Sequence, residues 1–377
     1  MLGKLSAKDG AVGDASQGNR RLGRVLLTGG AGFIGTSLSA LLDGADEVVV
    51  LDNLHPQIHE TGERPAALDA RARLIVGDVT SPEAWDEVLE QEHPDTVVHL
   101  AAETGTGQSL TESSRHANVN VVGTTQMLDA FLRHDAMPQR LVLTSSRAVY
   151  GEGAWVDDAG QQVYPGQRSV EQLEAGTWDF PGLQPVAMRA DGVQPGPVSV
   201  YAATKLAQEH LIRTWAESFE VEAVILRLQN VYGPGQSLIN PYTGIMSLFC
   251  RMAMGGSSIP LYEDGLVRRD FVLIDDVARA VLAACTVEAV PSGPLDIGLG
   301  TMHTISDAAA LIAADYGAPQ PHVSGQFRLG DVRHAWADIS DATAALDWRP
   351  QHDLADGIHR LATWINAQPN VQPVRLP

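Results

Sequence analysis

The 377-residue sequence predicts an α/β protein with a doubly wound parallel sheet, a smaller C-terminal α/β domain and an inserted segment. Three observations support this fold class. Short apolar runs that could form buried strands alternate with amphipathic helical patterns along most of the chain. The first run, residues 25–28, leads into a glycine-rich turn and then a helical pattern. The next run, residues 47–51, ends in Asp52, about 20 residues beyond the start of that turn.

The composition is that of a globular protein, with 44% hydrophobic and 19% charged residues. No run approaches the ~20 apolar residues of a membrane span, so we expect no membrane partner. Residues 1–22 are polar and Gly-rich, which indicates a flexible tail on a cytoplasmic protein. The two cysteines, Cys250 and Cys285, cannot by themselves form a disulfide framework or a zinc site. We expect both in the core, and no bound metal.

The charge pattern excludes one class of partner and singles out one residue. A net charge of -20 argues against nucleic-acid binding, which normally needs a basic face. Only three of the 26 basic residues are lysines, namely Lys4, Lys8 and Lys205. The first two lie in the tail. Lys205 is therefore the only lysine of the folded body, which suggests a position where a compact ammonium is required.

The glycine turn predicts a dinucleotide site. Glycines in a turn between a strand and a helix let the backbone approach a pyrophosphate, which then lies at the N-terminus of the helix. Asp52, at the end of the second strand, could accept both ribose hydroxyls and would repel a 2′-phosphate, which favours NAD over NADP. A purely structural turn is the alternative. The cofactor contacts expected here are Gly29, Gly32, Phe33, Ile34, Gly35, Asp52 and Asn53.

The third and fourth strands extend the same face. Residues 73–78 form an apolar run that ends in Asp78, whose carboxylate lies where it could bind the amino group of an adenine. A helix follows over 82–91. Residues 96–102 form the fourth strand, and its small residues allow close packing against a cofactor. His99 fits a packed strand histidine better than a catalyst. The cofactor contacts expected from these segments are Asp78, Val79, Leu100, Ala101 and Ala102.

Polar groups then gather at the carboxyl edge of the sheet, where open α/β sheets build their sites. Residues 103–110 form a polar loop, a long helix is expected over 114–134, and residues 140–146 form the fifth strand. These segments add Asn120 and Thr144 as cofactor contacts, Thr104 and Ser145 as substrate contacts, and Ser146 as a catalytic hydroxyl.

The pattern breaks down over residues 151–197, which are rich in Gly, Pro, Gln and acidic residues. A structureless stretch of this length is uncommon inside a domain, so we expect an inserted subdomain or lid. Regular elements are then expected as helix 200–219, strand 222–228, helix 245–253, strand 266–274, helix 275–285, strand 295–297, and helices 306–316 and 354–367.

This order predicts two domains. Residues 23–230 and 266–297, with the insert 151–197, would form the NAD-binding domain. Residues 231–265 and 298–377 would form the substrate-binding domain.

Tyr201 and Lys205 are four residues apart on the expected helix, so they share one face. A tyrosine hydroxyl with a pKa of ~10 is a poor base at neutral pH, but an adjacent ammonium and an oxidised nicotinamide both favour its phenolate. An exposed helix pair is the alternative reading. The lone body lysine and the preceding dinucleotide site favour catalysis by Tyr201, Lys205 and Ser146.

Ordered motifs from residue 24 to residue 367 resemble the extended short-chain dehydrogenase/reductase family of nucleotide-sugar enzymes, whose core is a Rossmann-type sheet. The motifs are the glycine turn, Gly77-Asp78, His99-Leu100-Ala101-Ala102, Thr144-Ser145-Ser146, Tyr201-Ala202-Ala203-Thr204-Lys205 and Arg269-Asp270-Phe271. The resemblance implies that Tyr201 is the acid/base, that Lys205 positions the nicotinamide ribose, and that Ser146 holds the reacting hydroxyl. It also implies that Asn230 and Arg269 bind the nucleotide diphosphate, with Arg328 and Asp331 nearby. A surface salt bridge is the alternative for Arg269 and Arg328.

The residues after Ser146 narrow the reaction. Relatives that resemble 4,6-dehydratases carry an Asp-Glu pair there, and decarboxylases keep the Glu, whereas this sequence has Arg147-Ala148. We therefore expect NAD-dependent 4-epimerisation of a nucleotide-diphosphate hexose through a 4-keto intermediate. The alternatives are an NAD(P)H-dependent 4-ketoreductase, a UDP-hexose or UDP-uronate 4-epimerase and, more remotely, a non-catalytic NAD-binding regulator.

Within the family, the chain is most similar to the dTDP-L-rhamnose 4-epimerases and related bacterial 4-epimerases. Residues 226–237 and 240–245 and the insert carry this likeness. It implies a dTDP-6-deoxyhexose substrate, with UDP as the other candidate nucleotide, and a homodimer through helices 114–134 and 200–219. Such relatives often carry paired Cys-x-x-Cys elements in the insert, but this insert has no cysteine.

Overall fold

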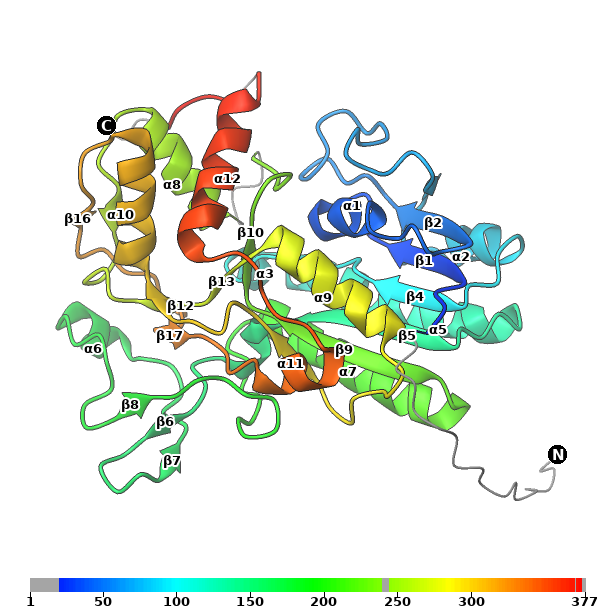
Figure 1. Ribbon diagram of the computed structural model, residues 1–377. Coiled ribbons are helices and arrows are strands. Elements are labelled where there is room, and N and C mark those ends of the chain that lie inside the picture. The colour runs from blue at the N-terminus through cyan, green and yellow to red at the C-terminus, as the bar shows by residue number, and fades with distance from the viewer. Residues whose placement is uncertain (1–19, 239–243, 370, 375–377) are drawn as a thin grey trace.

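The computed structural model describes residues 20–238, 244–369 and 371–374 (Figure 1). Most of the N-terminal tail lies outside the described residues. So do residues 240–243, which belong to a segment that carries the likeness to the dTDP-L-rhamnose 4-epimerases. Within the described part, no helix is both long and apolar enough to cross a membrane.

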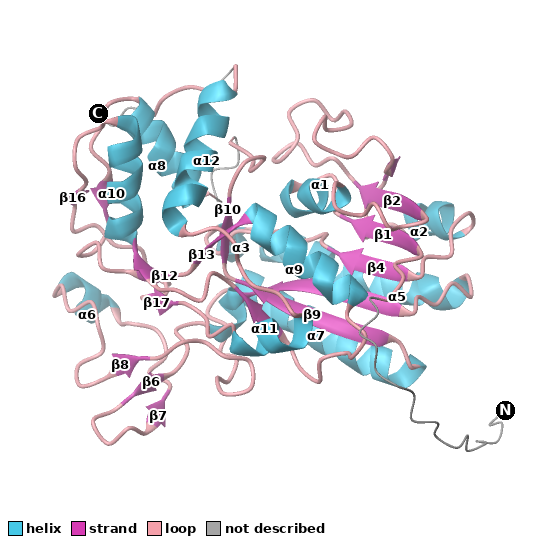
Figure 2. Ribbon diagram, viewed as in Figure 1, coloured by secondary structure: helices cyan, strands magenta, loops and turns pink. Residues whose placement is uncertain are grey.

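A seven-stranded parallel sheet forms the centre of the molecule (Figure 2). Its order is β14-β9-β5-β4-β1-β2-β3, so the chain winds outward from β1 in both directions. The fold class predicted from the sequence is confirmed. The strands are β1 (Arg24–Thr28), β2 (Glu47–Asp52), β3 (Arg73–Val76), β4 (Thr96–His99), β5 (Arg140–Ser146), β9 (Glu222–Leu228) and β14 (Leu295–Ile297).

Helices cover both faces of this sheet, which explains why its strands read as nearly continuous apolar runs. In β1, Val25 and Leu27 contribute to the core on one face and Leu26 to the core on the other. The first core is shared with α1 (Phe33–Ser39), α9 (Ile274–Thr286) and α11 (Ser340–Leu346). The second is shared with α2 (Pro82–Leu89), α5 (Gly123–Arg133) and α7 (Val200–Phe219).

Two positions at the junction of β1 and α1 require glycine, Gly29 in the turn and Gly35 within α1. Gly29 has a φ of +66°, and a Cβ there would lie 2.7 Å from the backbone of Ala101. A Cβ on Gly35 would lie 2.4 Å from the backbone of Gly30. These contacts bring β1, the turn and the segment after β4 close together.

The long helix expected over 114–134 is interrupted. It consists of α4 (Ser113–Ala117), a π-helical turn (Asn118–Val122) and α5, preceded by the short α3 (Gln108–Thr111). Such π-turns are rare and often lie at functional sites. Asn120 lies in this turn and is fully buried.

The C-terminal part has a core of its own, built from β10, β13, α8, α10 and α12. Figure 1 shows α8, α10 and α12 side by side, beyond the edge of the large sheet. The elements here are β10 (Asn230–Tyr232), α8 (Ile245–Met254), β11 (Pro260–Leu261), β12 (Arg268–Arg269), β13 (Phe271–Leu273), β15 (His303–Thr304), α10 (Ile305–Tyr316), β16 (His322–Val323), β17 (His334–Ala335) and α12 (Leu354–Ala367).

The prediction of a single strand over residues 266–274 is wrong. The segment divides at Asp270 into β12, which pairs with β15 and β17, and β13, which pairs with β10. The N–H of Asp270 donates to Ala335, and its carbonyl accepts from Asn230. Its buried carboxylate accepts the backbone N–H groups of Leu299 and Gly300 at 2.6 and 3.0 Å. Asp270 therefore joins two small sheets to the loop after β14.

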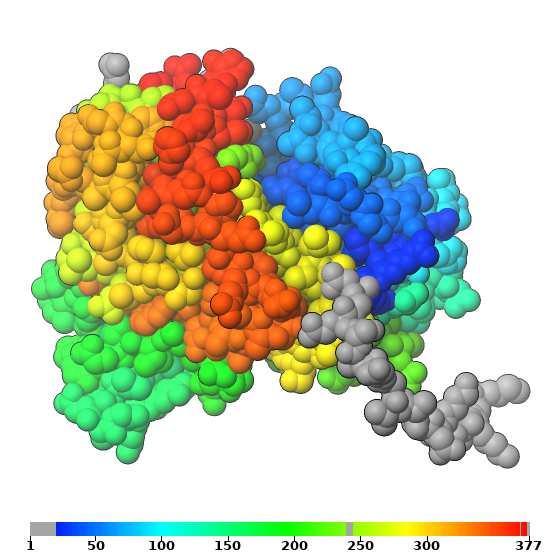
Figure 3. Space-filling model, viewed as in Figure 1, coloured from blue at the N-terminus to red at the C-terminus, as the bar shows by residue number. Residues whose placement is uncertain are grey.

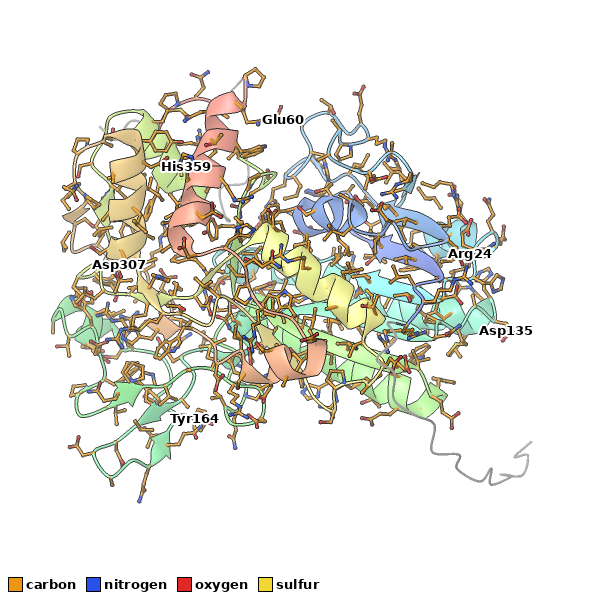
Figure 4. The ribbon with its side chains drawn as sticks, in the orientation of Figure 1. Arg24, Glu60, Asp135, Tyr164, Asp307 and His359 are labelled. Atoms are coloured by element: carbon orange, nitrogen blue, oxygen red, sulfur yellow. The ribbon has the colours of Figure 1, made fainter. Side chains whose placement is uncertain are left out.

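The insert is folded rather than structureless. It contains β6 (Trp155–Val156), β7 (Gln162–Val163), α6 (Val170–Glu174) and β8 (Gln184–Pro185), and the strands form a sheet in the order β7-β6-β8. Figures 3 and 4 show this segment projecting beside the C-terminal part, and Figure 4 labels Tyr164 within it.

A buried ion-pair network fixes the insert to the C-terminal part. Arg168 of the insert binds both carboxylate oxygens of Glu263, at 2.8 and 2.9 Å. Arg333 binds Glu263 at 2.9 Å and Asp264 at 2.7 Å, and it reaches back to Asp179 of the insert at 2.9 Å. Moving the insert relative to the C-terminal part would separate these ion pairs and leave buried charges unpaired. The cluster therefore restricts the orientation of the insert.

Candidate active site

The candidate site lies at the carboxyl ends of β1, β4 and β5, beside the first turns of α7. Ser199 caps α7 by accepting the backbone N–H of Ala202 at 3.1 Å, so Tyr201 lies in the first turn and Lys205 one turn later. Ser146 ends β5 and opens a 3₁₀ turn, Arg147–Tyr150. The structure thus brings the three expected catalytic residues to one place.

The environment of Tyr201 contains opposing influences on its ionisation. Burial raises the pKa of the phenol above its usual value. A hydrogen bond with Ser146 and the positive charge of Arg147 both act to lower that pKa. Burial outweighs these two effects, so the pKa of Tyr201 stays above its usual value, and Ser146 and Arg147 offset the cost of the phenolate only in part.

Lys205 is almost completely buried, with 3% of its surface exposed. Its Nζ donates to Oε1 of Gln208 at 2.5 Å. Burial lowers the pKa of this ammonium to about 7, although the charge of Glu209 opposes the change. A lysine with this pKa can change its protonation state near neutral pH.

The two serines at the end of β5 have different surroundings. Ser145 is buried, and its hydroxyl donates to the Glu209 carboxylate at 2.5 Å. Arg227 of β9 also binds Glu209, at 2.7 and 3.0 Å. These contacts join α7 to β5 and β9 and occupy the hydroxyl of Ser145 within the protein, and the substrate contact expected for Ser145 stays a prediction. Ser146 alone faces Tyr201.

Asp296 of β14 lies next to this cluster and leads to a stability prediction. Its Oδ2 accepts the hydroxyl of Tyr150 at 2.7 Å, while its Oδ1 is buried without a partner among the described residues. Burial raises the pKa of Asp296 to about 7. Because the folded-state pKa exceeds the unfolded value of 3.8, this group stabilises the fold below about pH 4, and the contribution is lost as the pH rises through about 7.

We therefore expect the free energy of unfolding of the wild type to fall relative to that of Asp296→Asn between about pH 4 and about pH 8, by on the order of 2–4 kcal/mol. Urea denaturation at several pH values measures this difference. The control is Asp158→Asn, which replaces an exposed carboxylate of the insert. Parallel stability curves for wild type and Asp296→Asn would contradict the prediction.

The cofactor side of the site is formed by the glycine turn and the end of β2. Helix α1 begins after Gly32, and Phe33 and Ile34 are its first residues. Its N-terminus has no side-chain cap and no acidic residue in the first turn. Asp52 is buried, and its two carboxylate oxygens accept the backbone N–H groups of Ala31 and Leu54 at 3.0 and 2.9 Å. The carboxylate is thus held at the sheet edge with lone pairs left for ribose hydroxyls, an arrangement that fits NAD.

The remaining expected cofactor contacts fall into two groups. Asn53 donates to Asp78 at 2.9 Å, so these two lie together at the ends of β2 and β3, next to the buried Val79. Leu100, Ala101 and Ala102 follow β4 and are partly exposed beside Gly29.

Thr144 and Asn120 lie deeper than expected. Thr144 donates to the carbonyl of His99 at 3.4 Å. Asn120 exchanges hydrogen bonds with the backbone of Glu103 at 2.7 and 3.0 Å, and donates to Thr204 of α7 at 2.9 Å. Since its amide is occupied within the protein, Asn120 connects the loop after β4 to α7.

Arginines and an amide mark the substrate side. Arg269 donates to the carbonyls of Arg268, Val332 and Arg333 at 2.6–3.2 Å, and no ion pair to it is seen among the described residues. Burial, with the nearby charge of Arg147, lowers its pKa to about 9. Asn230 begins β10 with its Oδ1 buried and without a partner in the described structure. Arg269 fits an anionic ligand, whereas the free Oδ1 of Asn230 accepts and therefore fits a hydrogen-bond donor of the ligand.

The other expected substrate contacts are more exposed. Arg328 lies over the ring of Tyr262, 5.1 Å from its centroid. Asp331 is exposed, and its charge acts on both Arg147 and Arg269. Thr104 is partly buried in the loop after β4.

Two features of the site could have been anticipated from spacing but were not. Gln208 and Glu209 follow Lys205 by three and four residues, so they share its side of α7. Arg147 directly follows Ser146, and its charge acts on Tyr201. Among the described residues, no group of three or more His, Cys, Asp and Glu side chains could hold a metal ion.

Comparisons with known proteins agree on one family. The model of the NAD dependent epimerase/dehydratase family matches residues 25–298. A dTDP-L-rhamnose 4-epimerase from Burkholderia thailandensis is 57% identical over 343 residues, which cover 91% of this chain and 94% of that protein.

The chain is also similar to solved structures of nucleotide-sugar 4-epimerases. The UDP-glucose 4-epimerase of Thermotoga maritima, solved with UDP-glucose, has a TM-score of 0.75 and 25% identity, covering 91% of this chain and 98% of that one. The UDP-glucose 4-epimerase of Thermus thermophilus, in complex with NAD, has a TM-score of 0.71 and 28% identity, covering 91% and 99%.

Proposed function

The chain belongs to the NAD-dependent epimerase/dehydratase family, and from this membership we propose that it inverts C4 of a dTDP-6-deoxyhexose such as dTDP-L-rhamnose. It is an NAD-dependent nucleotide-sugar epimerase. The observation that carries the reaction is the grouping of Ser146, Tyr201 and Lys205 beside the glycine turn, with Arg147-Ala148 in place of the acids of a dehydratase.

In the proposed mechanism, Ser146 holds the 4-hydroxyl of the sugar and Tyr201 removes its proton. NAD, when bound, supplies the chemistry of taking a hydride from C4 and giving it back. The 4-keto sugar turns over in the pocket, and Tyr201 returns the proton to the oxygen after the opposite face of C4 has been reduced. Lys205 favours the tyrosine phenolate through its positive charge. There is no net oxidation or reduction.

Substrate binding is proposed for the other polar groups. Arg269 and Asn230 bind the diphosphate, and Arg328 and Asp331 lie on the nucleotide side. Arg269 is suited to this role because its charge is held in place by three carbonyls rather than by a carboxylate. Thr104 contacts the sugar.

We also propose a cytoplasmic homodimer. Exposed apolar side chains lie on the helices expected to form the dimer surface, namely Val122, Leu132 and Phe219, each at least 40% exposed. The free cysteines Cys250 and Cys285 are both buried, as in proteins of reducing compartments.

The test is proton NMR of purified protein, without added cofactor, incubated with a panel of dTDP- and UDP-hexoses in deuterated water. A new sugar with inverted coupling at C4 and no deuterium at C3 or C5 would support 4-epimerisation by internal hydride return, and would identify the substrate. Conversion only after NADH and a 4-keto sugar are supplied would favour the 4-ketoreductase instead.

A further inference from the structure

A chain of buried side chains lies behind Lys205 and crosses four elements of the fold. Gln208 of α7 accepts the Lys205 ammonium on Oε1 at 2.5 Å. Its Nε2 lies 2.8 Å from Oγ1 of Thr124 on α5 and 3.2 Å from Nε2 of His99 on β4. Nδ1 of His99 lies 2.7 Å from Oγ1 of Thr28, the last residue of β1. All five side chains are at most 3% exposed.

The donors and acceptors of this chain fix the orientation of the Gln208 amide. An ammonium has no acceptor, so Lys205 must donate to the carbonyl of Gln208. The amide nitrogen of Gln208 then points to His99 and Thr124 as a donor. Burial lowers the pKa of His99 to about 3, so its ring is neutral. Nε2 of His99 also lies 3.0 Å from Oγ1 of Thr124, so two tautomers satisfy the ring: Nδ1–H donated to Thr28 with Nε2 accepting from Gln208, or Nε2–H donated to Thr124 with Nδ1 accepting from Thr28.

The chain has a direct consequence for the site. Thr28 immediately precedes Gly29, the residue that brings β1 against the segment after β4. The carbonyl that receives the ammonium is therefore fixed with respect to the glycine turn. A glutamine free to rotate could present its amide nitrogen to Lys205, but here Thr124 opposes that orientation, because its hydroxyl already donates to the carbonyl of Asn120 and can only accept from Gln208.

We propose that Gln208 is the positioning residue of Lys205, and that the chain Thr28–His99–Gln208 holds the ammonium in place and in its charged form. This inference rests on the proposed function, because Lys205 matters only if Tyr201 needs an adjacent positive charge. Gln208 itself does not touch the reacting atoms.

Few charged groups near Lys205 could hold its ammonium in place and in its charged form. Glu209, on the same helix, favours the ammonium, but it is already paired with Arg227 and Ser145. From β4, His99 faces the ammonium as a neutral ring. Tyr201 lies one turn away on α7. As a neutral phenol it carries no charge that would stabilise the Lys205 ammonium. The Gln208 carbonyl is thus the direct neutral acceptor.

The scarcity of lysine makes a direct test possible. Protein labelled with ¹³C at lysine Cε has only three labelled residues, Lys4, Lys8 and Lys205. The signal that disappears in Lys205→Arg identifies Lys205. Its chemical shift, followed against pH in the protein as purified with its cofactor, gives the pKa of the ammonium without any measurement of activity.

Two substitutions at the same position should move this pKa in opposite directions. Gln208→Met removes the acceptor at similar volume, and we expect the Lys205 pKa to fall by about one unit. Gln208→Glu replaces the carbonyl with a carboxylate, and we expect the pKa to rise by about one unit or more. A residue that only fills space would not produce shifts of opposite sign. Gln91→Met, on the exposed surface after α2, is the matched control and should leave the pKa unchanged.

The rate of epimerisation supplies the second measurement. Gln208→Met should lower kcat about tenfold or more with little change in KM, and should add no further loss in a Lys205→Ala background. An unchanged Lys205 pKa in both variants, or shifts in the same direction, would overturn the proposal. So would additive losses with Lys205→Ala. If the wild type converts no sugar, the proposed function fails, while the NMR titration still decides the role of Gln208.

Discussion

Tyr201→Phe should lower turnover by about 10³-fold or more while the protein retains its bound NAD. The substitution removes only the hydroxyl, so the ring still fills its place in the first turn of α7. General acid/base catalysis contributes about 10²–10⁴-fold to a rate, and this reaction uses the same hydroxyl to remove and to return a proton. The measurement is kcat by NMR, together with the cofactor content of the purified variant.

Tyr164→Phe provides the control for this experiment. Tyr164 directly follows β7 in the insert, where Figure 4 labels it, and is 43% exposed. Its hydroxyl accepts from the side chain of Gln162 and the backbone N–H of Gln194, both of them outside α7. We expect normal turnover. Wild-type turnover in Tyr201→Phe itself would overturn the assignment of the acid/base.

The large sheet could be predicted from the sequence because its determinants are local. Both faces of each strand are covered, so runs such as residues 48–51 are apolar throughout and easily recognised. Their ends are harder to place. The fourth strand, expected over 96–102, ends at His99, and Leu100 keeps only one sheet-like hydrogen bond, to Thr28. The small residues that follow turn toward the site instead of continuing the ladder.

Features that depend on distant partners could not be predicted. Asp270 divides an apparently continuous strand because its backbone pairs with Ala335 on one side and Asn230 on the other. The insert has no long apolar run of its own, and Arg168 finds Glu263 about 95 residues further along the chain. No periodicity in the sequence carries such information.

The candidate site shows the same division. Spacing along one helix correctly grouped Tyr201 with Lys205, whereas the separation of Ser145 from Ser146 required the structure. Adjacent residues of a strand point to opposite faces, so one of the two serines had to turn away from the site. Glu209 determines which one, since it binds Ser145.

Lys205→Arg should lower turnover by about 10²-fold or more, although the charge is retained. Lys205 is 3% exposed, and within the described part of the chain its ammonium donates to one acceptor, Gln208. A guanidinium is planar, larger and has five donors in a fixed geometry, so burial here would leave several of them unpaired. It also cannot lose its proton, whereas burial brings the pKa of Lys205 to about 7.

The matched control is Arg213→Lys, two turns further along the same helix, where the side chain is 46% exposed and pairs only loosely with Glu217. We expect wild-type kcat and cofactor content in this variant, because a solvated cation tolerates the exchange. The comparison separates the chemistry of the cation from the effect of any Arg and Lys exchange on α7. Near-normal turnover in Lys205→Arg would show that the site needs only a positive charge. In that case the scarcity of lysine in the body of the protein would have no catalytic meaning.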